Sequence, residues 1–307
     1  MCIFHVPIPP GIHPQFIGPS SLDRSVTRYW ADGFVGDRRF CSTCGCHMGD
    51  YVESNDSWYL APALFAKDES VFIIDEHIYT QSAPKGVWEW IPSIGERQLK
   101  MTISDDESAL PDISKPEVGN EGEERLRAEC HCGGVAVTLS RPTEEDLRDE
   151  WIAKFVSPVD KSKWSALIDV CNDCRLISGV HINAWTFIPL SACSPAIDKS
   201  LKHGTMKSYT SSPGVTRTFC GVCGATVFYF SEHRVDRDDN VVVDLAVGLL
   251  RAPEGVRAEN WLTWRTSELA NLEAGRRYDP ELFASLQKGM NDWAEAAHGH
   301  TLEFRIP

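Results

Sequence analysis

The chain has 307 residues, 42% of them hydrophobic, which is the composition of a soluble globular protein with room for roughly two domains. Its formal net charge of −14 and the lack of a dense Lys/Arg run argue against nucleic-acid binding and against docking on anionic membranes. No stretch approaches the ~20 apolar residues of a membrane span, and the proline-rich start has no signal-peptide pattern, so we expect a cytoplasmic protein.

An acidic segment divides the chain into two parts. Residues 104–125 are rich in Asp and Glu, contain two prolines and two glycines, and show neither helical nor strand periodicity. We interpret this segment as an exposed linker. It separates an N-terminal part, residues 1–103, from a larger C-terminal domain, residues 126–307.

Most of the C-terminal domain is typical of short strands bounded by turn residues, namely residues 134–140, 182–188, 226–230 and 241–247. Two segments have helical spacing instead. Residues 143–155 open with a Thr-x-x-Asp capping pattern, and residues 279–297 open with Asp-Pro. The sequence therefore predicts a mainly β domain with peripheral helices.

One motif occurs twice. Arg-x-Phe-Cys-x-x-Cys-Gly occupies residues 38–45 and again residues 217–224, with a tyrosine before each copy at Tyr29 and Tyr209. Chance does not readily repeat the flanking residues together with the cysteines, so we predict an internal duplication. The N-terminal copy lacks the cysteine motifs that precede the second copy, and we interpret it as a truncated repeat.

The cysteines of the truncated repeat leave two alternatives open. Cys41 and Cys44 either bind zinc with further ligands, none of which their spacing favours, or are a leftover pair of thiols. The candidate partners for a zinc site are Cys46, His47, Cys2 and His5.

The chain has 11 cysteines, an odd number whose spacing indicates metal binding rather than a disulfide framework. Cys130 and Cys132 form a Cys-x-Cys pair, and Cys220 and Cys223 form Cys-x-x-Cys-Gly, each directly before a predicted strand. Four thiolates fill a tetrahedron and leave no open position, which is typical of structural zinc. Four buried free thiols are the alternative, but they would need no regular spacing.

A third pair, Cys171 and Cys174, has no partner pair. Asp169 extends it to Asp-x-Cys-x-x-Cys, which could supply one oxygen and two sulfur ligands and leave a position for water or a substrate thiolate. Arg175 could lower a thiolate pKa or hold a substrate carboxylate. The alternative is a pair of thiols that pack, or bind metal, without chemistry.

The order of these motifs resembles the glutathione-dependent formaldehyde-activating enzymes and their relative centromere protein V. It runs from Cys-His-Cys-Gly at 130–133 through Cys-x-x-Cys-Arg and a Ser-Ser-Pro-Gly turn at 211–214 to Cys-x-x-Cys-Gly at 220–224. The resemblance implies a zinc-containing β-tent fold, a structural four-cysteine zinc, and a second zinc at the central cysteine cluster. Glutathione or its thiol adduct would engage at that cluster.

This chain departs from the family at one position of the cluster. The family usually has Cys-x-Cys-x-x-Cys, whereas Asp169 stands here in place of the first cysteine. A site of two thiolates and one carboxylate is harder and more Lewis acidic than one of three thiolates. It therefore favours a different thiol adduct or a non-thiol substrate.

Further residues in or near these motifs are candidates for substrate binding: Ser178, His181, Trp185, Tyr209, Ser211 and Ser212. His181 could act as an acid or base, and the two aromatic residues could form the walls of a pocket. Each has a structural alternative, in hydrogen bonding, turn formation or core packing.

The sequence thus predicts a zinc-dependent enzyme resembling carbon–sulfur lyases, acting on a glutathione or other thiol adduct of a small carbonyl-type molecule. Its catalytic residues would be Asp169, Cys171, Cys174 and Arg175, with Zn²⁺ at both cysteine clusters and glutathione as a candidate co-substrate. We expect a small-molecule substrate and neither nucleic-acid nor membrane partners, and an oligomer is compatible with the sequence. The alternatives are a non-catalytic zinc-stabilised binding module and a zinc enzyme with a non-thiol substrate.

Overall fold

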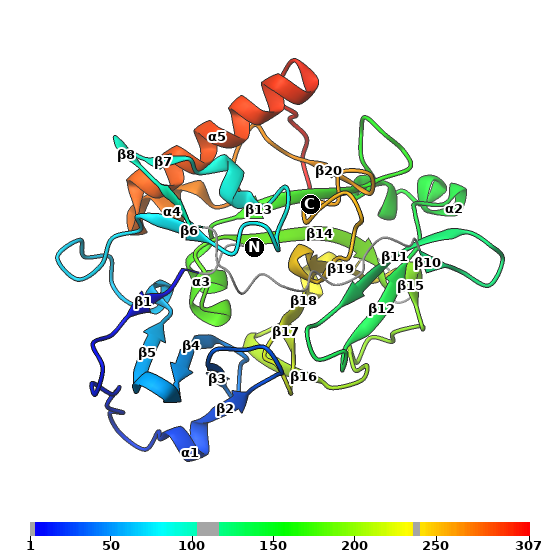
Figure 1. Ribbon diagram of the computed structural model, residues 1–307. Helices are drawn as coiled ribbons and strands as arrows, with labels where there is room; N and C mark the ends of the chain where they lie inside the picture. The colour runs from blue at the N-terminus through cyan, green and yellow to red at the C-terminus, as the bar shows by residue number, and fades with distance from the viewer. Residues whose placement is uncertain (1–3, 103–116, 236–239) are drawn as a thin grey trace.

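The computed structural model describes residues 4–102, 117–235 and 240–307. A five-stranded sheet, the first sheet, has the order β1-β5-β4-β3-β2, and a seven-stranded sheet, the second sheet, has the order β16-β17-β18-β19-β14-β13-β20. The first sheet (blue) lies beside β16 and β17, and helix α5 (red) lies on the opposite side of the molecule (Figure 1). A four-stranded sheet has the order β10-β11-β12-β15, and two small sheets pair β6 with β9 and β7 with β8.

The strands before the acidic segment are β1 (Val6–Pro7), β2 (Val26–Tyr29), β3 (Asp37–Cys41), β4 (His47–Val52), β5 (Ser57–Leu60), β6 (Glu76–Ile78), β7 (Ser93–Ile94), β8 (Arg97–Gln98) and β9 (Lys100–Thr102). Those after it are β10 (Glu117–Val118), β11 (Glu124–Glu129), β12 (Ala136–Leu139), β13 (Trp164–Asp169), β14 (Asn183–Pro189), β15 (Cys193–Ser194), β16 (Met206–Ser212), β17 (Val215–Cys220), β18 (Thr226–Ser231), β19 (Val242–Ala246) and β20 (Leu262–Trp264). The α-helices are α1 (Leu22–Ser25), α2 (Glu144–Arg148), α3 (Asn172–Ser178), α4 (Leu272–Tyr278) and α5 (Pro280–His298). Single 3₁₀ turns are η1 (Glu53–Asn55), η2 (Pro62–Leu64), η3 (Val87–Trp90), η4 (Ile152–Lys154), η5 (Leu190–Ala192), η6 (Glu232–Arg234) and η7 (Val247–Leu249).

The structure confirms the four predicted strands as β12, β14, β18 and β19, and the C-terminal helix as α5. The Asp279 carboxylate caps α5 by accepting a hydrogen bond from the Leu282 amide at 3.0 Å. The predicted helix over 143–155 is wrong beyond Arg148. Asp149 accepts hydrogen bonds from the next two free amides, at 2.9 and 3.0 Å, and this local alternative to helical bonding ends α2 after its capping box.

The segment interpreted as a linker is partly structured. Residues 104–116 lie outside the described residues, but β10 and the first residues of β11 fall within 104–125 and form an antiparallel pair, with Glu117 opposite Arg125. A two-residue strand is too short for its alternation to show in the sequence. Its hydrogen bonds to β11 therefore come from the tertiary structure rather than from a sequence pattern.

The N-terminal part and the C-terminal domain share one hydrophobic core, which includes Phe40, Trp90, Phe219 and Trp264. The Trp90 ring packs edge-on against Trp264 of β20 at 5.7 Å and lies 5.3 Å from Trp293 of α5. The buried Arg257 guanidinium lies 5.3 Å from the Trp90 ring centroid and donates to Glu89 at 2.7 Å. Residues 87–94 are thus anchored to the C-terminal domain.

The first and second sheets share a strand order and a strand register. Arg38 lies opposite Tyr29 on one side and Asp50 on the other, just as Arg217 lies opposite Tyr209 and Tyr229. Both hairpins have a register shift at the same place, after Arg39 in β3 and between Arg217 and Phe219 in β17. The order β1-β5-β4-β3-β2 matches β14-β19-β18-β17-β16 strand for strand.

The two hairpins also pack against each other reciprocally. A Cβ on Gly45 would lie 2.4 Å from the Phe219 ring, and a Cβ on Gly224 would lie 2.6 Å from the Phe40 ring. Both glycines have positive φ, +79° and +76°, which disfavours any side chain. The phenylalanine of each repeated motif therefore leaves no room for a side chain at the glycine that ends the other motif.

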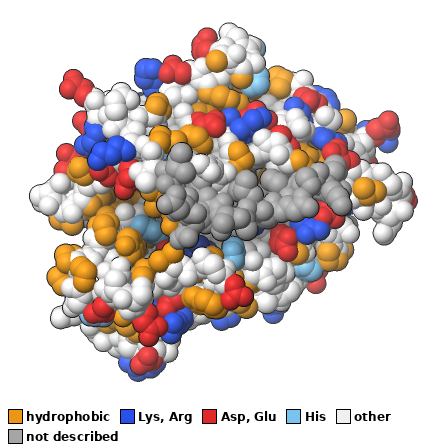
Figure 2. All heavy atoms as spheres, in the orientation of Figure 1, with side chains coloured by type: hydrophobic (Ala, Val, Ile, Leu, Met, Phe, Trp, Pro, Cys, Tyr) orange, Lys and Arg blue, Asp and Glu red, His pale blue; other side chains and the backbone are white. Residues whose placement is uncertain are grey.

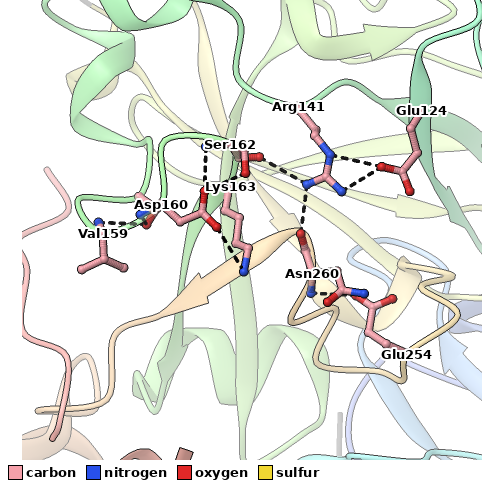
Figure 3. A network of polar contacts seen from close by, with 9 residues as sticks. Glu124, Arg141, Val159, Asp160, Ser162, Lys163, Glu254 and Asn260 are labelled. Atoms are coloured by element: carbon pink, nitrogen blue, oxygen red, sulfur yellow. Dashed lines mark hydrogen bonds and ion pairs between the residues drawn. The ribbon is translucent and has the colours of Figure 1, made fainter. Parts of the chain in front are cut away.

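A polar network anchors the sheet of β11 and β12 to two loops (Figure 3). The Arg141 guanidinium bonds Glu124 at 2.8 Å and donates to the carbonyls of Ser162 and Asn260 at 3.3 and 2.9 Å. Its face lies 3.9 Å from the Trp261 ring centroid. One cation thus connects β11 with the segments that directly precede β13 and β20.

On the face of the molecule in Figure 2, Lys and Arg side chains are interspersed with Asp and Glu. Among the described residues, none of the helices combines the length and apolar character that crossing a membrane requires.

Candidate metal centres and the adjoining pocket

The structure brings Cys130, Cys132, Cys220 and Cys223 together, with ligand sulfurs within 4.8 Å of one another. The first two lie in the β11–β12 turn, Cys220 ends β17, and Cys223 lies in the β17–β18 turn. Glycines with positive φ, Gly133 at +71° and Gly224 at +76°, let each turn curl around its sulfurs.

The geometry of this group fits a metal ion with four thiolate ligands. The Cys132 sulfur is 3.5 Å from the sulfurs of Cys130 and Cys220. A tetrahedron of Zn–S bonds of about 2.3 Å has edges of about 3.8 Å, so small adjustments would complete it. Backbone amides point at the sulfurs, among them Val135 N at 3.3 Å from Cys130 and Cys223 N at 3.4 Å from Cys220. Such donors stabilise thiolate charge.

A second group, Asp169, Cys171 and Cys174, also has its ligand atoms within 4.8 Å of one another. Asp169 ends β13, and the two cysteines flank the first turn of α3. The Asp169 Oδ1 atom accepts hydrogen bonds from the Cys171 amide at 2.9 Å and from the Asn271 side-chain amide at 2.8 Å. These bonds orient the carboxylate and leave its other oxygen for a ligand.

The two thiols of this group differ in acidity. The hydrogen bond from Cys174 lowers the pKa of Cys171 to about 6, whereas that bond and burial raise the pKa of Cys174 far above its usual range. In the absence of metal, one thiolate and one thiol therefore share a proton. Two sulfurs and a carboxylate are a donor set that zinc accepts, and they leave a fourth position open.

Arg217 is a site residue that sequence reasoning missed. Its guanidinium donates to the Cys174 sulfur at 3.4 Å and to the Ser211 hydroxyl at 3.2 Å, and it stacks 4.8 Å from the Tyr229 ring centroid. The side chain is buried. The signal was present, since this arginine opens the repeated Arg-x-Phe-Cys motif, but the sequence indicates a site role only for the cysteines of that motif.

A small cavity opens beside Cys174. Its walls are Cys44, Cys174, Ile177, Ser178, Asn183, Trp185, Arg217, Thr218, Phe219, Thr226 and Phe228. The volume open to the centre of a water-sized sphere is about 10 Å³, about the space that one water molecule needs. Cys44 is the wall residue that comes from the N-terminal part.

The predicted substrate-binding residues divide into two groups. Ser178 and Trp185 line the cavity, and Ser211 contacts it through Arg217. Tyr209 and Ser212 do not line it. Tyr209 is half-buried on β16 opposite Arg217, and Ser212 is exposed where the register of β16 shifts.

Arg175 and His181 point to a different part of the structure. Arg175 donates to the Ala63 carbonyl and to the Asn172 side chain, and it stacks 3.9 Å from the Tyr278 ring centroid. His181 is buried with its Nε2 atom 3.4 Å from the Tyr278 hydroxyl, and burial lowers its pKa to about 3. Both residues thus contribute to packing between α3, α4 and η2, away from the cavity walls.

In the first sheet, Cys41 and Cys44 form a hydrogen-bonded pair, and the bond from Cys44 lowers the pKa of Cys41 to about 5. No third ligand-type side chain joins them among the described residues, and Cys2 lies outside those residues. Buried Cys46 instead donates to the Leu176 carbonyl at 3.0 Å. His5 and His47 lie together with Asp50.

These observations define a mainly β protein with two cysteine-containing groups able to hold metal ions, one of them beside a cavity. Residues 157–265 match the model of the family described as glutathione-dependent formaldehyde-activating enzyme. The match covers 109 of the 307 residues, so about a third of the chain is similar to that family. The matched residues include Asp169, Cys174 and Arg217, and they begin after Cys130 and Cys132. A search of the curated proteins found no match.

Proposed function

We propose that the protein is a zinc-dependent enzyme of the carbon–sulfur lyase type, which makes or breaks the bond between a thiol sulfur and the carbon of a small carbonyl compound. The observation that most directly supports this function is that Cys174 belongs both to the three-residue metal group and to the cavity wall. A ligand position at that group would face the cavity. The family match favours glutathione as the thiol.

We assign the two groups different roles. The four cysteines would hold a structural zinc, because their donors fill a tetrahedron. Asp169, Cys171 and Cys174 would hold the second zinc, which supplies Lewis acidity and keeps a bound thiol ionised.

The remaining roles follow from contacts. Arg217, already donating to Cys174, would hold negative charge that develops on sulfur or oxygen. Ser178 donates to the Cys174 carbonyl at 2.6 Å and fixes the turn that carries this cysteine. Because the cavity holds about one water, only the reactive end of an adduct would enter it.

We also propose that the first sheet is a partial copy of the second, and that the C-terminal domain is a β-tent. The shared strand order, the shared register and the reciprocal glycine–phenylalanine contacts support the copy. A cytoplasmic location is part of the proposal, since the described cysteines are all free thiols.

The experiment combines metal analysis with a rate. Reduced glutathione and formaldehyde are mixed, and exchange between free aldehyde and the S-hydroxymethyl adduct is followed by NMR with and without protein. The thiol proton moves to the carbonyl oxygen as the C–S bond forms. We expect acceleration by the wild type, loss of acceleration in Cys174→Ala, and wild-type rates in Cys193→Ala, a buried thiol outside both groups.

The alternatives correspond to other outcomes. If exchange of every thiol and small aldehyde tried is unaffected and only one zinc is bound per chain, the protein is a zinc-stabilised binding module. If aldehyde hydration without thiol is accelerated instead, the carboxylate at position 169 has shifted the enzyme to a non-thiol substrate. Acceleration that survives in Cys174→Ala excludes chemistry at this cluster.

A further inference from the structure

Three metal-ligating side chains of the first sheet meet outside the site described above. The Nε2 atoms of His5 and His47 face each other at 2.8 Å, and His5 Nδ1 is 3.5 Å from an Asp50 carboxylate oxygen. One ligand atom of each residue lies within 4.8 Å of the others. We propose that His5, His47 and Asp50 bind a divalent transition-metal ion such as Zn²⁺.

A β-bulge puts His47 and Asp50 on one face. Residues three apart in a regular strand point to opposite faces. In β4, however, Asp50 pairs with Arg38 whereas His47 pairs with Phe40, so one extra residue lies between the two pairs. Arg38 and Phe40 are two apart and share a face, and their partners therefore share it too. Bulges commonly re-aim side chains at functional sites.

The same register places His5 beside them. Asp50 pairs with Tyr59, and Tyr59 pairs with Pro7 of β1. Paired residues share a face, and His5 is two residues before Pro7, so its side chain lies on the face of Asp50. Two segments, β4 and the residue before β1, thus bring three side chains to one point.

This point is equivalent to the cavity of the second sheet. Strand pairing aligns His5 with Trp185, His47 with Thr226 and Arg38 with Arg217. Trp185, Thr226 and Arg217 all line the cavity beside Cys174. At this position the second sheet has the cavity beside Cys174 of α3. The first sheet instead has the side chains of His5, His47 and Asp50.

The donor set decides the class of ligand. Two imidazoles and one carboxylate suit zinc and neighbouring divalent metals, and they leave a position for water. The His5 and Asp50 side chains are 25% and 26% exposed, so an ion can enter. The Nδ1 atom of His47 is buried and has no hydrogen-bond partner in the described part of the chain, which leaves the ring free to shift onto an ion.

Arg38 sets a limit on the affinity. It lies opposite Asp50, and its positive charge acts on all three residues. A cation therefore binds here more weakly than at the four cysteines, and Arg38→Gln should tighten binding.

The test adds Co²⁺ to the full-length protein after two equivalents of zinc per chain, which fill the cysteine groups and leave the weaker histidine site open. We expect one further ion per chain, with a visible spectrum of nitrogen and oxygen ligands and no sulfur-to-cobalt charge-transfer band. His5→Gln, His47→Gln and Asp50→Asn should each weaken this binding about tenfold or more, a loss that even an outer-shell partner can cause. His13→Gln is the matched control, since His13 pairs with Asp56 at 3.0 Å and joins no three-ligand group among the residues that the structure describes.

Zinc retained at the cysteines shows that each variant is folded. If His47→Gln loses that zinc, the His5→Gln and Asp50→Asn variants decide the question. The proposal is overturned if zinc-loaded wild type takes up no cobalt, if the added cobalt shows thiolate ligation, or if these two variants bind it like the wild type. Cobalt binding does not involve Cys171 or Cys174, so a failure here is distinct from a failure of the proposed lyase activity.

Discussion

Asp169 tests the second metal group most directly, because this carboxylate has two separable roles. One oxygen accepts hydrogen bonds from the Cys171 amide and from Asn271, at 2.9 and 2.8 Å, and the other is free to bind an ion. Asp169→Asn can keep both hydrogen bonds through its remaining oxygen while it replaces the anionic ligand with a neutral NH₂ group. The variant therefore affects metal affinity more than folding.

The magnitudes follow from these contacts. Hydrogen bonds to a charged acceptor are worth about 1 kcal/mol more than neutral ones, so the loss of charge at two bonds costs about 2 kcal/mol of stability. Loss of the ligand should weaken the second ion about 100-fold or more, since outer-shell partners alone are worth about 10–100-fold. Asp169→Cys should retain or tighten zinc by restoring three thiolates, but it leaves two donors unpaired and lowers stability.

Asn271 provides a matched outer-shell variant. Its φ of +59° is left-handed, so Asn271→Gly removes the amide without backbone strain. We expect zinc affinity between those of the wild type and Asp169→Asn. The assay is competition with a chromophoric chelator after removal of the labile ion, alongside thermal unfolding. Equal zinc affinity in wild type, Asp169→Asn and Asp169→Cys, with stability alone changed, would refute ligation by Asp169.

Two further predictions concern the cysteines. Cys220→Ser should lower zinc content by about one ion per chain and leave the protein unfolded near physiological temperature. The reason is that a structural zinc contributes on the order of 10 kcal/mol to folding, which is comparable with the whole stability of a domain. Unchanged metal content by mass spectrometry would contradict this prediction. In protein that keeps the four-cysteine zinc and has lost only the second ion, the lowered pKa of Cys171, about 6, keeps its thiol ionised above that pH. Its alkylation rate should therefore level off by about pH 7, about one unit above this pKa, whereas the rate of an ordinary cysteine of pKa about 8.5 keeps rising to about pH 9.5. A Cys171 midpoint like that of free cysteine, from peptide mass spectrometry, would count against the hydrogen bond from Cys174.

Local sequence patterns were sufficient wherever one segment carried the whole signal. The helix that begins after Asp279 has its cap, its proline and its apolar spacing within a few residues, so it could be predicted. The cysteine pairs could be recognised for the same reason, since each pair lies in one turn. The prediction of a helix over 143–155 was wrong because the Asp149 side chain accepts hydrogen bonds from the backbone amides of Trp151 and Ile152. Helix propensity does not reveal this contact.

The sequence by itself determined the mainly β character, the repeated motif, the family resemblance and the cysteine pairs as candidate ligands. Only the tertiary structure decided which side chains share a site. Arg217 contacts Cys174 across 43 residues, Cys44 reaches the cavity from the N-terminal part, and Arg175 turns from Cys174 toward Tyr278. The His5, His47 and Asp50 group depends on strand register and on one bulge. Strand register is set by pairing between distant segments, and a single inserted residue moves the side chains that follow it to the other face of the sheet. The sequence pattern of one strand does not show either effect.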